Sequence, residues 1–262
     1  MHGALSVIHP TAIVHSGAKL GSGVTVGAYA LIGEHVEIGE GTWIGPHVVI
    51  EGRTRIGPQN RVFQFCSLGA VPQDKKYAGE PSALEIGTRN TIREFCTFNT
   101  GTVQDAAVTR IGDDNWIMAY VHLAHDCQIG NNTIFANNAQ LAGHVHVGDW
   151  AVLGGFTAVH QFVSIGAHSI TALGTILLAD LPPYVTAAGN TAAPHGINAE
   201  GLRRRGYSPE TIARIKTAYK TLYRSGLTLE QAKQELAAQA QECPELCLLS
   251  DFLQRSRRGI IR

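Results

Sequence analysis

The residues best suited to chemistry lie near the middle of the chain and follow a fixed spacing. His125, Gly143 and Gln161 are 18 residues apart, and Asp126 and His144 repeat that interval one position later. A neutral imidazole can accept a proton, a carboxylate can orient it, and a glycine leaves its backbone N–H open to a ligand. The group suits general-base catalysis, in which His125 removes a hydroxyl proton, Asp126 orients the imidazole and the Gly143 N–H stabilises an oxyanion.

Other polar side chains are expected close to this group, namely His122, Asn137, Asn138, Gln140 and His160. Zinc held between chains by two histidines five residues apart is disfavoured, because no two histidines here have that spacing. A nucleophilic Cys127 is disfavoured because strand alternation turns it inward or places it at a corner, and no serine lies in a strained glycine elbow. We therefore expect no metal. The remaining alternative is a solvated face on which histidines are merely tolerated.

A second candidate group is the run Arg203-Arg204-Arg205, with Asn198 and Glu200 just before it. Guanidinium groups form paired hydrogen bonds that match the geometry of a phosphate. The competing interpretation is a solvated helix end that carries positive charge for solubility alone.

These residues lie on a repeat with a period of six. An aliphatic residue recurs in perfect register at Ile8, Val14, Leu20, Val26, Ile32, Ile38, Ile44, Ile50, Ile56, Val62 and Leu68. After an interruption the repeat resumes one position out of step at Ile111 and continues to Ile165. A period of six fits neither a helix nor a long strand. It predicts short strands joined by tight corners, with one aliphatic side chain pointing inward from each strand.

Three such strands close a triangular coil of 18 residues, and successive coils stack at about 4.8 Å. The sequence therefore predicts a parallel β-helix over residues 1–190, in which residues 18 apart lie above one another. Two polar stretches interrupt the repeat. Residues 71–84 should protrude as a loop, and residues 101–110 form a shorter interruption that shifts the register by one.

Residues 191–262 carry helical signals instead and should form a small C-terminal helical domain. Ser208 followed by Pro209 is typical of a helix start, and Thr228 should cap a second helix from Leu229 to about residue 240. A third helix is expected over Glu245–Arg257. A helical domain this small needs a surface to pack on, either the end of the triangular β-helix or a neighbouring copy of it.

The composition excludes several classes of protein. Of 262 residues, 44% are hydrophobic and 16% are charged, and the formal net charge is zero. No basic field is present to support non-specific nucleic-acid binding, and no apolar run is long enough to span a membrane. The five cysteines form no CxxC pair, which favours free thiols in a cytoplasmic protein.

Motifs outside the generic repeat resemble one enzyme family. They are QDKKYAGEP (Gln73–Pro81), AHDCQIGNN (Ala124–Asn132), LAGHV (Leu141–Val145), HQF (His160–Phe162) and GINAEGLRRRGY (Gly196–Tyr207). Together they resemble the acyl-[acyl-carrier-protein]–UDP-N-acetylglucosamine O-acyltransferases, which carry out the first step of lipid A synthesis in Gram-negative bacteria. The resemblance covers essentially all of the chain.

The resemblance implies an all-β, left-handed hexapeptide β-helix with a helical tail, assembled as a homotrimer with active sites between prisms. The handedness rests on the resemblance, since parallel crossovers are normally right-handed. It implies transfer of an (R)-3-hydroxyacyl chain from acyl carrier protein, without a cofactor, to the 3-hydroxyl of UDP-N-acetylglucosamine. His125 falls on the catalytic base of the family. The positions that line its substrate sites are Asp74, Lys76, His122, Gly143, His144, His160, Gln161, Asn198, Glu200, Arg204 and Arg205.

Two departures from the family pattern affect these expectations. Asn99-Thr100 stands where the family commonly has a His-Arg pair, and Leu173 stands where long-chain members have a glycine at the end of the acyl channel. With Ile170 beside it, Leu173 predicts a shorter donor, of about ten to twelve carbons rather than fourteen. A related acyltransferase acting on another sugar nucleotide or an amine, and a non-catalytic ligand-binding scaffold, remain as alternatives.

Overall fold

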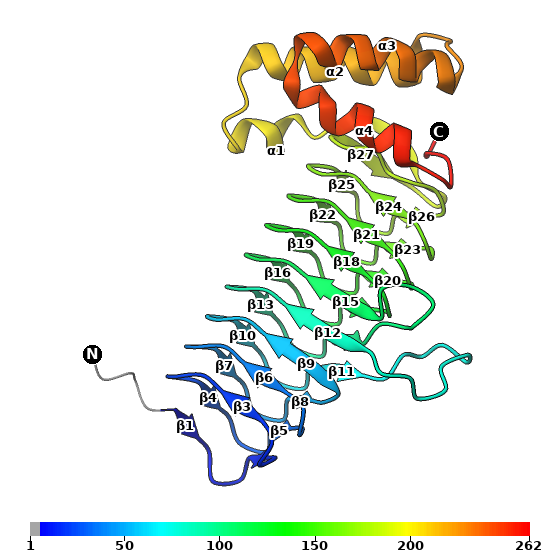
Figure 1. The fold of residues 1–262 in the computed structure, drawn as a ribbon. Helices are drawn as coiled ribbons and strands as arrows, with labels where there is room; N and C mark the ends of the chain where they lie inside the picture. The colour runs from blue at the N-terminus through cyan, green and yellow to red at the C-terminus, as the bar shows by residue number, and fades with distance from the viewer. Residues whose placement is uncertain (1–5) are drawn as a thin grey trace.

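The computed structural model describes residues 6–262, which form a three-sided prism of short strands closed at one end by helices (Figure 1). The predicted β-helix domain starts at residue 1, so its first five residues lie outside the described residues. Each turn of the chain contributes one strand to each face in order, so strands three apart in sequence pair as neighbours. All of these pairings are parallel except the last one on the first face.

The first face contains eleven strands. They are β1 (Val7–Ile8), β4 (Thr25–Val26), β7 (Trp43–Ile44), β10 (Arg61–Val62), β13 (Thr91–Ile92), β16 (Trp116–Ile117), β19 (Ile134–Phe135), β22 (Val152–Leu153), β25 (Ile170–Thr171), β27 (Val185–Ala188) and β28 (Ala193–Ile197).

The second face contains nine strands and the third face eight. The second comprises β2 (Ile13–Val14), β5 (Leu31–Ile32), β8 (Val49–Ile50), β11 (Ser67–Ala70), β14 (Thr97–Asn99), β17 (His122–Leu123), β20 (Gln140–Leu141), β23 (Ala158–Val159) and β26 (Ile176–Leu177). The third comprises β3 (Lys19–Leu20), β6 (Glu37–Ile38), β9 (Arg53–Ile56), β12 (Ala83–Ile86), β15 (Val108–Ile111), β18 (Gln128–Ile129), β21 (His146–Val147) and β24 (Ser164–Ile165). We call the edge between the first and second faces the first corner, that between the second and third faces the second corner, and the remaining edge the third corner.

The register confirms the predicted 18-residue stacking. Leu123 pairs with Leu141, and Leu141 pairs with Val159. The repeated aliphatic residues fill the interior of the prism, where most are fully buried. Ile8 departs from this pattern and is 44% exposed, because the coil that contains it is covered on one side only within the described residues.

Both interruptions of the repeat form loops at the second corner. Residues 71–82 join β11 to β12 and extend far from the prism (Figure 1), and residues 101–107 join β14 to β15. As a result, Arg61 pairs with Thr91, and Thr91 with Trp116, at separations larger than 18. The coils on either side of each loop still stack in register.

The helices are α1 (Ala199–Arg204), α2 (Pro209–Arg224), α3 (Leu229–Glu242) and α4 (Cys247–Arg255), with a short 3₁₀ turn, η1 (Pro244–Leu246), before α4. The predicted caps are confirmed: Ser208 accepts a hydrogen bond from Thr211 N, and Thr228 forms a reciprocal capping box with Gln231. The predicted third helix begins as the 3₁₀ turn and ends two residues early. The short helix α1 is not among the predicted helices, although the arginine run at its end is interpreted as a possible helix end. The expected domain boundary at residue 190 falls in the turn between β27 and β28.

The helices pack on the end of the prism. The ring of Tyr184 belongs to the helical core, and its hydroxyl donates to the Glu245 carbonyl oxygen at 2.6 Å. Ser256 donates to the Asp180 carboxylate at 2.6 Å. Across residues 6–262, no helix is both long enough and apolar enough to cross a bilayer.

Candidate active site

Consecutive turns at the second corner stack the predicted catalytic column. The turns that follow β17, β20 and β23 carry His125, Gly143 and Gln161 respectively. His144 N donates to the His125 carbonyl oxygen at 3.0 Å, and Phe162 N donates to the Gly143 carbonyl oxygen at 3.1 Å. The structure thus brings His125 and Gly143 together as the 18-residue spacing predicts.

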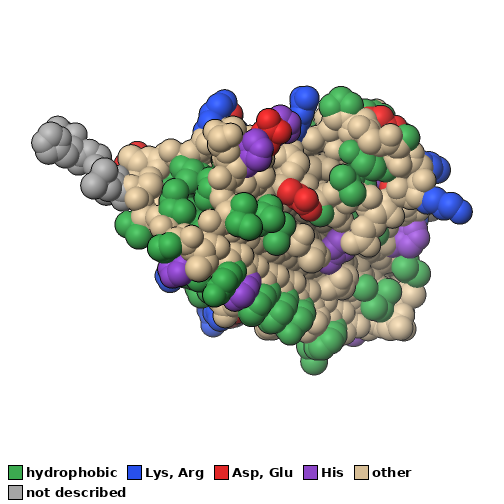
Figure 2. Space-filling model, turned by 90° about the horizontal axis from the view of Figure 1, so that it is seen from below, with side chains coloured by type: hydrophobic (Ala, Val, Ile, Leu, Met, Phe, Trp, Pro, Cys, Tyr) green, Lys and Arg blue, Asp and Glu red, His purple; other side chains and the backbone are tan. Residues whose placement is uncertain are grey.

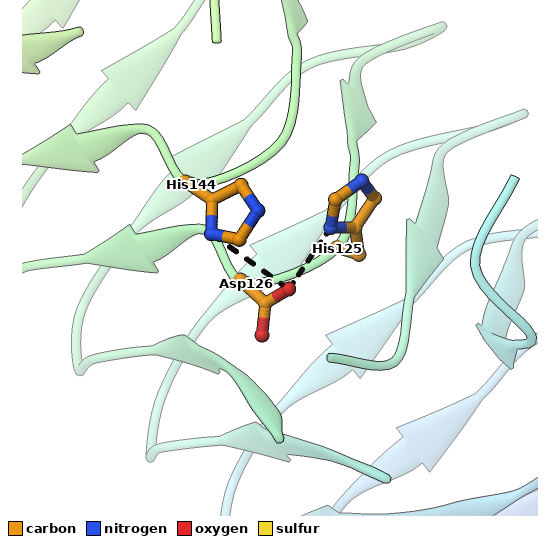
Figure 3. A group of neighbouring side chains, drawn as sticks. All are labelled: His125, Asp126 and His144. Atoms are coloured by element: carbon orange, nitrogen blue, oxygen red, sulfur yellow. Dashed lines mark hydrogen bonds and ion pairs between the residues drawn. The ribbon is translucent and has the colours of Figure 1, made fainter. Parts of the chain in front are cut away.

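His125 and Asp126 form a hydrogen-bonded dyad (Figure 3). Nδ1 of His125 lies 2.9 Å from Oδ2 of Asp126, whose side chain is fully buried. Burial alone would raise the pKa of Asp126, but hydrogen bonds from His125 and Thr102 outweigh burial and hold the pKa below its usual value. An ionised carboxylate can only accept, so Nδ1 of His125 carries the proton. In a neutral ring, Nε2 is then the free base.

Gly143 makes room for the imidazole. A Cβ atom at this position would lie 2.5 Å from Cε1 and 2.7 Å from Nε2 of His125, closer than real contacts allow. No hydrogen bond found among residues 6–262 uses the Gly143 N–H. An unused N–H on a residue packed against the imidazole suits the stabilisation of an oxyanion formed during acyl transfer.

His144 packs against the dyad. Its ring meets His125 edge-on, with centroids 5.0 Å apart, and stacks on Phe162 at 4.3 Å. Nδ1 of His144 lies 2.8 Å from Oδ2 of Asp105 and 3.9 Å from Oδ2 of Asp126. Sequence reasoning missed Asp105 and Thr102 because both lie in the 101–107 loop, where the repeat gives no coordinates.

By distance, His125, Asp126 and His144 could also hold a metal ion, since their ligand atoms lie within 4.8 Å of one another. In this structure, however, the carboxylate of Asp126 is occupied by donors from His125 and Thr102. The expected absence of a metal stays a prediction.

The other predicted residues of this corner lie in neighbouring coils. His122, in β17, has Nδ1 2.7 Å from the Thr97 hydroxyl, and burial lowers its pKa, which favours a neutral ring. His160 and Gln161 are exposed in the turn after β23. Asp74 and Lys76 lie in the 71–82 loop, which leaves the same corner, and the Lys76 N–H donates to the Asp74 carboxylate at 3.0 Å.

The residues that were predicted to bind a phosphate lie near the third corner of the prism. Asn198 is the N-cap of α1, where Oδ1 accepts from Gly201 N and Nδ2 donates to the His168 carbonyl oxygen. Glu200 pairs with Arg203 and with Arg204.

The two candidate arginines differ in their surroundings. The side chain of Arg204 is 78% exposed. Arg205 lies with its guanidinium 5.1 Å from the ring of Trp150 and donates to the Trp150 carbonyl oxygen at 3.1 Å. Arg204 can therefore reach a ligand without leaving a packed position, whereas Arg205 already helps to anchor α1.

The predicted chain-length residues lie at yet another place. Leu173, in the turn after β25 at the first corner, is 76% exposed, and Ile170 is half-buried in β25. Asn137 and Asn138 lie at the same corner, in the turn between β19 and β20. The expectation that these two asparagines lie close to His125 is therefore wrong within one chain. Although the two asparagines are close to Gly143 in sequence, a full face of the prism separates consecutive corners.

A groove of about 1590 Å³ runs over the third face and under α4. Asp105, His144 and Phe162 line it, as do Arg257 and Arg258, whereas His125 does not. Within one chain, the proposed base thus stands at the border of this groove rather than inside it.

Comparison with known proteins identifies the family. Residues 180–261 match the protein-family model described as "Udp N-acetylglucosamine O-acyltransferase; Domain 2", and residues 109–143 match bacterial transferase hexapeptide repeats. A protein of Albidiferax ferrireducens named acyl-[acyl-carrier-protein]–UDP-N-acetylglucosamine O-acyltransferase is 63% identical, over 98% of this chain and 100% of its own length. One of the same name from a Janthinobacterium species is 62% identical, with the same coverage.

Solved structures agree. UDP-N-acetylglucosamine acyltransferase of Francisella novicida matches with a TM-score of 0.96 and 42% identity, covering 98% of this chain and 94% of that one. LpxA of Acinetobacter baumannii matches with a TM-score of 0.95 and 48% identity, covering 98% and 100%. The fold is the left-handed parallel β-helix with a small C-terminal helical part that the motifs implied. Because the similarity in sequence and fold spans nearly the whole chain, this protein belongs to the acyl-[acyl-carrier-protein]–UDP-N-acetylglucosamine O-acyltransferase family.

Proposed function

We propose that the protein transfers an (R)-3-hydroxyacyl chain from acyl carrier protein to the 3-hydroxyl of UDP-N-acetylglucosamine, in the cytoplasm, as the first step of lipid A biosynthesis. The observation that carries the proposal is the His125–Asp126 dyad, whose free Nε2 packs against Gly143, a residue with an N–H that is unused among residues 6–262. The relatives are named for an acyl-carrier-protein donor and a UDP-N-acetylglucosamine acceptor, which supplies the two substrates of the proposal.

The mechanism follows from these groups. Nε2 of His125 takes the proton of the sugar 3-hydroxyl while that oxygen attacks the thioester carbonyl carbon. The carbonyl oxygen becomes an oxyanion that accepts from the Gly143 N–H. When the carbon–sulfur bond breaks, the phosphopantetheine thiolate takes the proton from the imidazolium, and the dyad returns to its starting state. Asp126 stays ionised and balances the transient charge on His125. Proton transfer and oxyanion stabilisation suffice, so the proposal includes no metal and no cofactor of the enzyme itself.

The site needs more than one copy of the chain. His125 lies at the second corner, Leu173 at the first and Arg204 near the third, so no single prism can direct all three at one substrate. In a homotrimer of parallel prisms, corners of neighbouring copies face each other, which lets different corners share a site. This geometry favours the implied trimer, with Leu173 and Ile170 lining the acyl chain.

An exposed aromatic column supports that assembly. Five rings stack along the first corner with centroids 4.7–5.1 Å apart, at Tyr29, His47, Phe65, Phe95 and Tyr120. Phe95 is 41% and Tyr29 is 62% exposed in the single chain. Figure 2 shows a band of hydrophobic side chains along one edge of the prism. A continuous apolar edge of this kind is typical of an interface, and a second copy would bury it.

The remaining proposed contacts are with the acceptor and the donor. We assign Asp74, Lys76, His122, His144, His160, Gln161, Asn198, Glu200, Arg204 and Arg205 to the lining of the substrate sites, as the family pattern implies. The exposed Arg204 is the residue best placed to meet a phosphate, because among residues 6–262 its guanidinium pairs with the carboxylate of Glu200 alone.

The test is an assay of the purified protein with UDP-N-acetylglucosamine and (R)-3-hydroxyacyl-loaded acyl carrier protein. We expect an O-acylated nucleotide sugar, identified by mass spectrometry and by the position of its ester. Activity only with a different sugar nucleotide, or N-acylation of an amine, would favour the related acyltransferase. Ligand binding without turnover of any donor would favour the non-catalytic scaffold.

A further inference from the structure

The short loop of residues 101–107 lies directly against the dyad, although the repeat treats it as an interruption. It leaves the second corner one coil before the turn that carries His125. The Thr102 carbonyl oxygen accepts from Ala107 N at 3.0 Å and from Asp105 N at 3.2 Å, so the loop closes on itself. Thr102 is almost fully buried. The loop is thus an ordered turn that fixes the direction of the Thr102 N–H.

Thr102 holds the Asp126 carboxylate through three short contacts. Its N–H donates to Oδ1 at 2.9 Å and to Oδ2 at 3.1 Å, and its hydroxyl donates to Oδ2 at 2.7 Å. Oδ2 is also the atom that Nδ1 of His125 reaches. On the far side of the loop, Thr109 Oγ1 accepts from the backbone N–H of Asp126 at 2.8 Å. The position of Oδ2, and hence the orientation of the His125 ring, is therefore set by the loop.

Asp105 of the same loop holds the second imidazole. Its Oδ2 lies 2.8 Å from Nδ1 of His144, and its side chain is 45% exposed. A carboxylate at this distance fixes the tautomer that carries the proton on Nδ1 and leaves Nε2 free. Because the His144 ring stands edge-on against His125, its orientation also limits that of His125.

We propose that the 101–107 loop is a positioning element of the active site, in which Thr102 acts through Asp126 on His125 and Asp105 acts on His144. The proposal rests on the proposed role of His125 as base, and it assigns roles to two residues that lie outside the hexapeptide repeat. Neither residue touches substrate in this scheme. Each fixes the ring orientation and tautomer of a histidine.

The kinetic experiment compares variants of the loop in the full-length protein. Thr102→Val removes the hydroxyl donor at nearly constant shape, and Thr102→Ser restores the donor. Asp105→Ala removes the second carboxylate. Gln104→Ala is the matched control, because Gln104 is exposed in the same loop and makes no hydrogen bond to the described residues. Should Thr102→Val not fold, Thr102→Ala removes the same donor without adding an apolar group.

We expect Thr102→Val to lower kcat at least about tenfold while KM for both substrates stays within about twofold, since the lost interaction acts on the base and not on ground-state binding. Thr102→Ser should recover most of the activity, Asp105→Ala should lower kcat about threefold or more, and Gln104→Ala should match the wild type. Unchanged kcat in Thr102→Val, or loss in Gln104→Ala equal to that in Asp105→Ala, would overturn the proposal.

A spectroscopic readout keeps the test independent of turnover. In protein with ¹⁵N-labelled histidine, we expect His125 and His144 to show the Nδ1–H tautomer. Thr102→Val should raise the fraction of the opposite tautomer at His125 only, and Asp105→Ala at His144 only, with the signals assigned by substitution of each histidine. Unchanged tautomers in both variants would refute the loop's role. An inactive wild type with these tautomer changes would refute the proposed function and leave the loop's role standing.

Discussion

The orientation of one imidazole depends on a single carboxylate oxygen. Oδ2 of Asp126 receives Nδ1–H of His125 and the Thr102 hydroxyl, and both contacts lie out of water. Because low local polarity strengthens such hydrogen bonds, the His125 ring has one favoured tautomer, with Nε2 free. A general base needs that combination of orientation and tautomer before its substrate arrives.

Replacement of the base gives the first prediction. His125→Ala should lower kcat by at least about 100-fold, the usual contribution of a general base, while KM for the nucleotide sugar changes little. Steady-state kinetics and light scattering of the purified variant measure turnover and assembly together. Near-normal turnover in this variant would contradict the assignment and direct attention to His144 or His160.

The two arginines give the second prediction, because the structure separates their roles. Arg204→Ala should raise KM for UDP-N-acetylglucosamine and leave stability unchanged, since its exposed guanidinium, paired with Glu200 at the surface, can make a ground-state phosphate contact. Arg205→Ala should lower the free energy of unfolding by about 1–2 kcal/mol, through lost cation–π and hydrogen-bond contacts with Trp150. Chemical denaturation and kinetics measure both effects. An Arg205 variant with wild-type stability would show that its packing contributes nothing.

Among the elements, the third corner joins the prism to the helices. The ring of His168, in the turn after β24, lies between Trp150 and Tyr184, and the Tyr207 hydroxyl is 3.2 Å from its Nε2. Burial first, and then the charge of Arg205, lowers the pKa of His168 to about 4. Asp149 acts in the opposite direction with a smaller effect. The junction therefore holds a buried neutral histidine.

The third prediction follows from that histidine. In the unfolded chain His168 binds a proton near pH 6.5, whereas the folded protein takes it up only near pH 4. His168 makes its full contribution to the free energy of unfolding above about pH 6.5. This contribution falls as the pH drops toward 4, by up to about 3 kcal/mol. Urea unfolding at pH 7 and pH 4.5 should show a smaller pH-dependent loss in His168→Gln than in the wild type. Equal losses in the two proteins would rule out His168 as a source of the pH dependence.

At the scale of the whole molecule, the proposed trimer makes chain-length selection depend on two copies of the chain. A donor chain in a groove between prisms gains about 0.8 kcal/mol per buried CH₂ until a side chain blocks it. Leu173 extends from the first corner, and its Cδ1 would lie 3.1 Å from a Cβ at Gly155 in the coil below. Its volume equals that of roughly three or four methylenes relative to glycine. Overfilling a packed groove costs about 1–3 kcal/mol.

The fourth prediction is the length of the donor. The wild type should prefer acyl donors of about ten to twelve carbons. For longer donors, kcat/KM should be about 10- to 100-fold lower than for the preferred donor. Leu173→Gly should shift the optimum to longer chains. A series of acyl-loaded carrier proteins of even chain length, assayed against both proteins, measures the shift. A wild type that uses fourteen carbons best, with no response in Leu173→Gly, would show that this side chain does not meet the acyl chain.

The local regularities of the sequence were sufficient to predict the prism and the stacking of its turns. An aliphatic residue every six positions can be buried only if strands are short and corners regular, so Leu123 and Leu141 had to pair. That register is enough to place His125 beside Gly143, as the structure has them. The caps at Ser208 and Thr228 likewise fix the starts of α2 and α3, because their side chains satisfy N–H groups within three residues.

Tertiary structure alone decided what lies outside the repeat and how the corners are related. Thr102 and Asp105 meet the two histidines because a closed loop turns back on the prism, and no periodicity encodes such a path. Arg205 anchors α1 because the fold brings its guanidinium over the ring of Trp150, which is far away in sequence. His125 and Leu173 are separated because a full face of the prism lies between consecutive corners. Sequence patterns report neighbours along and between coils, whereas these contacts depend on how loops, helices and faces meet in space.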